Sequence, residues 1–140
     1  MTKYLRLFGF DSKYNSELDD LKIATISKEE TRIVLTRDRG LLKRNMITHG
    51  YLIRSLIPKE QVVEVFARFD LYNITQPFTR CMKCNGELIP IEKEKIKNKL
   101  LDNTYSSFDQ FYICDQCDQI YWKGSHYNKL IDLIQKFQNK

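Results

Sequence analysis

Four cysteines arranged as two Cys-x-x-Cys pairs have the spacing that points most directly to chemistry. Cys81 and Cys84 form the first pair, Cys114 and Cys117 form the second, and the chain has no other cysteine. In a reducing compartment two such pairs suit tetrahedral zinc, because each tight turn supplies two sulfur ligands. Four thiolates leave no open position for water, so we expect a structural zinc. Disulfides or an iron–sulfur cluster are the alternatives.

Three carboxylates form a second candidate site. Asp38 follows the apolar run at residues 32–36, which is typical of a buried strand, and thus lies where open α/β sheets place active sites. Asp19 and Asp20 stand at the predicted start of a helix. Carboxylates gathered there would bind Mg²⁺ or Mn²⁺, which activate water for attack on a phosphodiester. The alternative is that Asp19 and Asp38 each cap a helix.

Basic residues flank Asp38 and form a third candidate group. They are Arg37, Arg39, Lys43 and Arg44. Cations beside an acidic metal site attract a phosphate backbone, so these four are the predicted nucleic-acid contacts. The alternative is a solvated helix face, which is the commoner reason for such a run.

The segment at residues 121–126 holds the only tryptophan, Trp122, and ends at His126. Although His126 is close to the second cysteine pair, we expect it to be a packed or surface residue beside Trp122 rather than a metal ligand. We expect the aromatic residues to pack the cysteine-bearing module against its neighbour. Stacking on nucleic-acid bases is the alternative.

The elements that must position these residues alternate between helix and strand in the first half of the chain. The pattern predicts a helix ending at Gly9, a helix starting near Asp19, a helix over residues 40–44 and a helix from Pro58, with strands over residues 10–14, 32–36 and 50–53. This alternation indicates an α/β layer with a parallel sheet.

A polar, proline-containing segment at residues 72–78 marks the predicted boundary between two domains. We therefore expect an α/β domain over residues 1–75 and a zinc-ribbon-like module over residues 76–140. In the second module, predicted strands at residues 111–113 and 120–122 flank the second cysteine pair, and an amphipathic helix follows.

Composition excludes some classes of protein. The 140 residues include 42% hydrophobic and 29% charged residues, the balance of a globular chain rather than a disordered one. No apolar run approaches the ~20 residues that cross a bilayer, and no signal peptide is evident, so we expect a cytoplasmic protein with no membrane partner. The formal charge of +5 permits nucleic-acid binding without demonstrating it.

Several stretches together resemble the Mut-seven C-terminal RNase domain family, in which a PIN-like nuclease fold precedes a zinc ribbon. The stretches are Leu5-Arg-Leu-Phe-Gly-Phe-Asp11, Asp19-Asp20, Arg32-Ile-Val-Leu-Thr-Arg-Asp-Arg-Gly-Leu-Leu-Lys-Arg44, Arg80-Cys-Met-Lys-Cys-Asn-Gly86, Cys114-Asp-Gln-Cys117 and Tyr121-Trp-Lys-Gly-Ser-His126. The resemblance implies a PIN-like three-layer α/β domain with a four-cysteine zinc ribbon. It also implies metal-dependent RNA cleavage, with Asp20 and Asp38 on two of the acidic positions of the family.

The family usually begins with a strand that carries another active-site aspartate, and compared with that pattern Met1 falls inside the following helix, so strand and aspartate are missing here and we expect an N-terminally truncated PIN-like domain. An upstream start site, a fragment of a longer gene and a degenerate paralogue all remain open. The expected function is that of a Mg²⁺- or Mn²⁺-dependent ribonuclease with RNA as partner. The alternative is a non-catalytic RNA- or protein-binding module, or a chain whose sheet is completed by a protein partner or a second copy.

Overall fold

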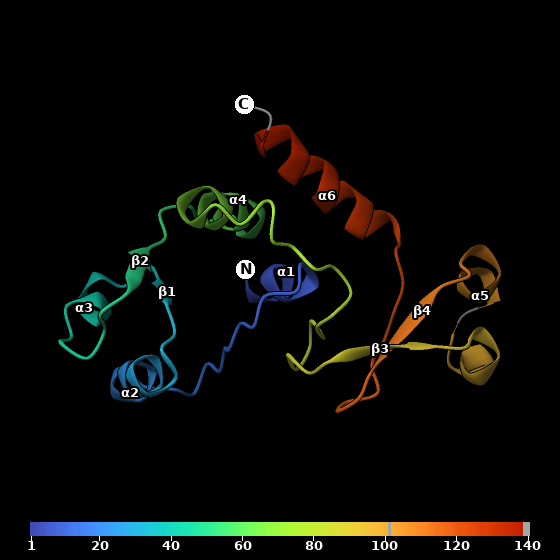
Figure 1. The fold of residues 1–140 in the computed structure, drawn as a ribbon, viewed down its shortest axis with the longest axis horizontal. Helices are drawn as coiled ribbons and strands as arrows, with labels where there is room; N and C mark the ends of the chain where they lie inside the picture. The colour runs from blue at the N-terminus through green and yellow to red at the C-terminus, as the bar shows by residue number, and fades with distance from the viewer. Residues whose placement is uncertain (101, 139–140) are drawn as a thin grey trace.

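The computed structural model describes residues 1–100 and 102–138 and has an α/β fold (Figure 1). In chain order the elements are α1 (Thr2–Leu7), α2 (Asp20–Glu30), β1 (Val34–Thr36), α3 (Arg39–Leu42), β2 (Gly50–Leu52), α4 (Pro58–Phe69), β3 (Leu88–Ile91), the 3₁₀ helix η1 (Lys93–Lys99), α5 (Asp102–Ser107), β4 (Phe111–Cys114), β5 (Ile120–Tyr121) and α6 (Ser125–Gln138). Apart from the segment at residues 10–14, the helices and strands predicted for the first half are present.

Strands β1 and β2 form a two-stranded parallel sheet, and α3 lies between them in the chain. The register pairs Val34 with Gly50 and Thr36 with Leu52. This parallel pair confirms the strands predicted at residues 32–36 and 50–53, with shorter bounds. Because α3 begins almost directly after β1, Asp38 lies at the junction between the end of the strand and the start of the helix.

Residues 10–14 form no strand, so the sequence prediction for this segment is wrong. The N–H of Phe10 donates to Leu5 O at 3.0 Å, which prolongs the end of α1. The N–H of Ser12 donates to the side-chain oxygen of Asn85 at 3.2 Å. Since these backbone groups bond to a helix end and a distant side chain, they are not available for a strand ladder.

The end of α1 is fixed by Gly9, as the sequence predicts. Gly9 has a φ of 93°, and a Cβ at this position would collide with the carbonyl oxygen of Gln76. The N–H of Gln76 donates to Phe8 O at 2.8 Å. Only glycine permits this close approach, so the chain before the first cysteine pair lies directly against the end of α1.

The main hydrophobic core joins α1, α4 and α6. Its buried residues are Leu5, Leu7, Phe8, Ile53, Val62, Val65, Phe66, Leu130 and Ile134. Helix α4 begins with Pro58 in its first turn and places its valines and Phe66 on one face. Helix α6, from the second half of the chain, contributes two residues to this core. The domain boundary near residue 75 stays a prediction, and α6 contacts the first segment across it.

A second, smaller core lies in the antiparallel sheet β3–β4–β5. Leu88 pairs with Cys114, and Ile113 pairs with Ile120. Ile96, Phe111 and Ile120 are buried together, and Trp122 packs against them. The predicted packing of Trp122 therefore occurs within this sheet rather than against the first segment. Among the described helices, none has the combination of length and apolar sequence that crossing a bilayer requires.

Candidate functional site

The first cysteine pair lies in a tight turn before β3. The N–H of Asn85 donates to Cys81 O at 2.9 Å, and Asn85 has a φ of 70°. The N–H of Gly86 points to the sulfur of Cys84 at 3.4 Å. A Cβ on Gly86 would lie 3.0 Å from the sulfur of Cys114, so glycine lets the two turns approach.

The second cysteine pair repeats this arrangement after β4. The N–H of Asp118 donates to Cys114 O at 3.1 Å, and Asp118 has a φ of 63°. The N–H of Gln116 points to the sulfur of Cys114 at 3.4 Å. Each turn therefore directs a backbone N–H toward a sulfur, which favours the thiolate form that a metal requires.

The four sulfurs lie within 4.8 Å of one another, and all four cysteines are free. The sulfurs of Cys81 and Cys117 are 3.6 Å apart, and those of Cys84 and Cys114 are 3.4 Å apart. A tetrahedron with Zn–S bonds of about 2.3 Å has edges of about 3.8 Å, so the spacing fits one zinc ion. An iron–sulfur cluster would hold its ligands farther apart, because several metal atoms would separate them.

A tyrosine hydroxyl adds a polar contact to the cysteine group. The hydroxyl of Tyr121 lies 3.0 Å from the sulfur of Cys81 and accepts the N–H of Lys83 at 3.3 Å. Desolvation raises the pKa of Cys81, but the Tyr121 hydroxyl and two backbone N–H groups outweigh it, leaving a pKa of about 7. Desolvation and the neighbouring thiols raise the pKa of Cys84 to about 12. A bound cation is therefore needed before Cys84 ionises near neutral pH.

His126 is exposed and does not join the cysteine group. Its ring stacks on Tyr4 of α1, with ring centroids 6.2 Å apart. Among the described residues, the four cysteines form the only group of three or more potential ligands within metal-binding distance.

The three predicted catalytic carboxylates lie at the starts of two helices. Asp19 caps α2 by accepting the N–H of Lys22 at 2.8 Å, and Asp20 lies in the first turn of that helix. Asp38 caps α3 by accepting the N–H of Gly40 at 2.8 Å. In each of these two caps one carboxylate oxygen makes the bond, and within the described chain the other oxygen has no protein partner.

The four predicted nucleic-acid contacts are all exposed around α3. Arg37, Arg39, Lys43 and Arg44 make no ion pair within the part of the chain that the structure describes. Among the described residues no carboxylate pairs with them, so their charges face solvent.

A shallow cavity of about 220 Å³ lies near the start of β1 and does not contain the predicted site residues. Ser27, Lys28, Arg32 and His49 contribute to its wall. Arg32 precedes β1, whereas Asp38 follows it, so the cavity lies toward the opposite end of the strand.

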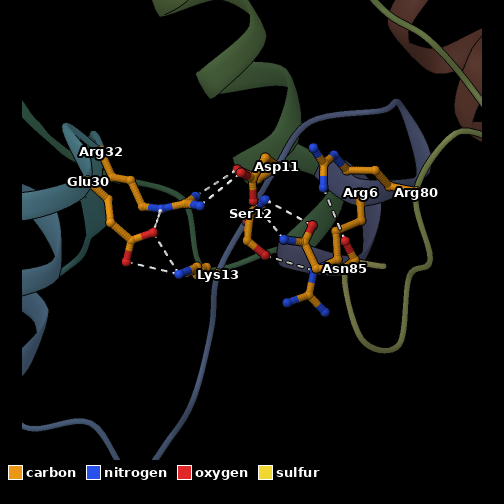
Figure 2. A network of polar contacts seen from close by, with 8 residues as sticks. All are labelled: Arg6, Asp11, Ser12, Lys13, Glu30, Arg32, Arg80 and Asn85. Atoms are coloured by element: carbon orange, nitrogen blue, oxygen red, sulfur yellow. Dashed lines mark hydrogen bonds and ion pairs between the residues drawn. The ribbon is translucent and has the colours of Figure 1, made fainter. Parts of the chain in front are cut away.

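Sequence reasoning missed a network of polar contacts beside the first cysteine pair. Figure 2 shows Asp11 between Arg32 on one side and Asn85 on the other, with Arg6 nearby. The one local signal for it is Arg6, a lone charge in the apolar run at residues 5–8. The sequence indicates no contact between Asn85 and Asp11, because the two positions lie far apart in the chain.

The fold and the cysteine group together define a small α/β protein with four cysteines placed so that they could hold a metal ion. The chain matches the Mut7-C RNAse domain family over residues 1–134, and it belongs to this family. The match confirms the resemblance seen in the sequence and supports a nuclease-like domain. No curated protein and no solved structure matches the chain.

Proposed function

We propose that the protein is a metal-dependent ribonuclease with a structural zinc ribbon and that its first half has the PIN-like three-layer arrangement. Membership of the RNase domain family is the observation that carries the proposal. The position of Asp38 supports it further, because Asp38 follows β1 at the carboxyl end of a parallel sheet, where α/β folds bind ligands.

Asp20 and Asp38 are the proposed ligands for Mg²⁺ or Mn²⁺, with Asp19 adjacent. Thr31, which has a φ of 53°, ends α2, and β1 begins three residues later, so Asp20 and Asp38 lie at the two ends of one short helix–strand unit. Carboxylate oxygens are the ligands that these ions prefer, and a bound ion supplies water activation and charge stabilisation at phosphorus.

The chain itself contributes charge and orientation to this reaction. Cap bonds to Lys22 and Gly40 fix the carboxylates of Asp19 and Asp38 and leave one oxygen of each free. Exposed cations at Arg37, Arg39 and Lys43 would bind the phosphates on either side of the scissile bond. Such contacts orient RNA without reading its sequence.

The test is RNA cleavage with Mn²⁺ by the wild type, Asp20→Asn and Asp38→Asn. Asparagine is a good helix cap, so Asp38→Asn should keep α3 while removing the charge. We expect activity to fall by about 100-fold or more, which corresponds to several kcal/mol of lost charge stabilisation. Asp132→Asn on the exposed face of α6 is the matched control and should retain activity. Equal activity in Asp38→Asn and Asp132→Asn would contradict the proposal for Asp38.

A non-catalytic RNA-binding module is the second candidate. It is favoured by the cap roles of Asp19 and Asp38 and by the lack of a three-carboxylate group among the described residues. This function predicts RNA binding that survives EDTA at concentrations too low to remove zinc, together with no cleavage in any divalent ion. Salt-sensitive binding that weakens in Lys43→Ala would assign the contact to the cations around α3.

Zinc is the proposed ion at the four cysteines. Elemental analysis should find about one zinc per chain, since one tetrahedral site is available. The free thiols suit a reducing compartment, and we propose the cytoplasm.

A further inference from the structure

A buried arginine joins α1 to the first cysteine turn. Arg6 is only 8% exposed. Its guanidinium donates to Ser12 O at 2.8 Å, to Met82 O at 3.1 Å and to Lys83 O at 3.2 Å. Two of these three carbonyl groups lie between Cys81 and Cys84. Because a buried guanidinium without acceptors is costly, Arg6 depends on the shape of this turn.

Asn85 makes a second connection from the same turn. Its backbone is held by the bond to Cys81 O, and its own carbonyl accepts the side chain of Arg80 at 3.1 Å. Its side chain faces the other way, accepting the N–H of Ser12 and donating to Asp11 Oδ1 at 2.6 Å (Figure 2). The segment at residues 11–12 is therefore bonded to a residue that directly follows a cysteine.

Asp11 continues the connection to the strand that precedes Asp38. Its other oxygen accepts from the guanidinium of Arg32 at 2.8 Å, and Arg32 also pairs with Glu30 at 3.1 Å. The N–H of Arg32 donates to Ser27 O at 3.0 Å. Arg32 thus joins the end of α2 to the start of β1. The contacts form a continuous path from the cysteine turn to this junction.

We infer that metal binding at the four cysteines orders residues 11–12 and the α2–β1 junction through Arg6, Asn85, Asp11 and Arg32. Zinc fixes the turn that presents the carbonyls of Met82 and Lys83 and the side chain of Asn85. Without the ion these groups no longer converge, and Asp11 and Ser12 lose their contacts to Asn85. Metal occupancy therefore regulates the α2–β1 unit that carries Asp20 and Asp38. The regulation of the unit that carries Asp20 and Asp38 is relevant to catalysis only if the proposed function holds. The coupling between metal binding and the order of these segments does not depend on that function.

Hydrogen exchange of the full chain tests the coupling without measuring RNA cleavage. The zinc-loaded wild type is compared with the reduced, chelator-treated protein. We expect amide exchange at residues 10–13 and 31–34 to become at least about tenfold faster on zinc removal, because the charged hydrogen bonds that hold these segments are lost. The exchange rate of the Ser12 amide measures the coupling directly, because this N–H donates to the side-chain oxygen of Asn85. Exchange in the middle of α4 should change less, because its buried side chains lie in the main hydrophobic core and none of the four residues of the path is among the buried residues of that core.

The variant Asn85→Gly distinguishes the effect of the Asn85 side chain from the effect of zinc binding. Glycine tolerates the φ of 70°, so the turn and the zinc content should be retained while the bonds to Asp11 and Ser12 are lost. With zinc bound, this variant should show faster exchange at Ser12 than the wild type, and removing zinc should add only the part that depends on the bonds of Arg6 to Met82 and Lys83. Lys13→Ala is the matched control, because Lys13 contacts Glu30 but not the cysteine turn.

Three results would overturn the inference. They are unchanged exchange at residues 10–13 and 31–34 after zinc removal, wild-type exchange in zinc-loaded Asn85→Gly, and equally faster exchange in α4 and at residues 10–13. An inactive enzyme with the expected exchange pattern would contradict only the proposed nuclease function. Active enzyme with an unchanged exchange pattern would contradict only the coupling.

Discussion

The hydroxyl of Tyr121 lies 3.0 Å from the sulfur of Cys81, so a residue of β5 contacts the first cysteine turn directly. The same hydroxyl accepts the N–H of Lys83. It can therefore donate its proton to the thiolate while its lone pair holds the backbone of the turn. This contact stabilises the thiolate of Cys81, a proposed zinc ligand, through a residue that is not itself a proposed ligand.

Replacing Tyr121 with phenylalanine should weaken zinc binding by roughly tenfold, which is typical for the loss of a hydrogen bond to a metal ligand. Competition with a chromophoric chelator would measure the affinity. Tyr112→Phe is the matched control, because Tyr112 pairs with Tyr121 across the sheet and its hydroxyl makes no bond to the cysteines. The prediction would be wrong if the two variants bound zinc equally well.

Zinc affinity should also rise steeply with pH. Desolvation and the neighbouring thiols raise the pKa of Cys84 to about 12, and desolvation also raises the pKa of Cys117. Both thiols are protonated between pH 7 and 8 in the metal-free protein, so both release protons when zinc binds. The slope of log affinity against pH should be about 2 or more. Affinity titrations in reducing buffer would measure it, and a slope near zero would show that the thiols were already ionised.

The sequence was sufficient to predict features that local chemistry determines. The spacing of the four cysteines alone predicts that they form one site. The helix α4 is predicted by Pro58 and by the apolar pattern of Val62, Val65 and Phe66. Asp19 and Asp38 were predicted as possible caps, and both cap helices. In each case the interacting groups lie within one or two turns of each other.

Contacts between distant segments could not be predicted in this way. The strand β3 contains Pro90, which a local reading disfavours, and it forms because it pairs with β4. Arg6 and Asp11 find their partners more than seventy positions away, in the first cysteine turn. Nothing in the neighbourhood of either residue specifies those partners, so the coupling path appears only once the chain is folded.

Acid should remove the stabilisation that Glu64 provides beyond the end of β2. Glu64 accepts the hydroxyl of Tyr51 at 2.7 Å and the N–H groups of Arg54 and Ser55 at 2.9 and 3.2 Å. Desolvation raises the pKa of Glu64, but these hydrogen bonds outweigh it, and the net pKa lies below its ordinary value. A lowered pKa in the folded state gives stability that is present above the unfolded value, about 4.3, and is lost as pH falls through the folded value.

Glu64→Gln should therefore be less stable than the wild type at pH 7, by about 1–2 kcal/mol for weakened charged hydrogen bonds. The difference should shrink below about pH 4, where the wild type loses its charge as well. Urea unfolding of both proteins at each pH would measure it, because any loss of zinc in acid is common to the two. Glu94→Gln on the exposed surface of η1 is the control. A difference that stayed constant down to pH 3 would contradict the role of the charge.

Leu130→Ala should destabilise the first half of the chain as well as α6. Leu130 is 1% exposed in the core formed with Phe8, Val62 and Phe66, so truncation leaves a cavity beneath α1 and α4. The expected cost is about 2–5 kcal/mol. Denaturant unfolding of the zinc-loaded protein would measure the loss, and hydrogen exchange would locate it. Ile89→Ala is the control, because Ile89 is 47% exposed and its truncation opens no cavity. If Leu130→Ala loosened α6 while the exchange of α1 and α4 stayed at the wild-type rate, the two halves would not share one cooperative core.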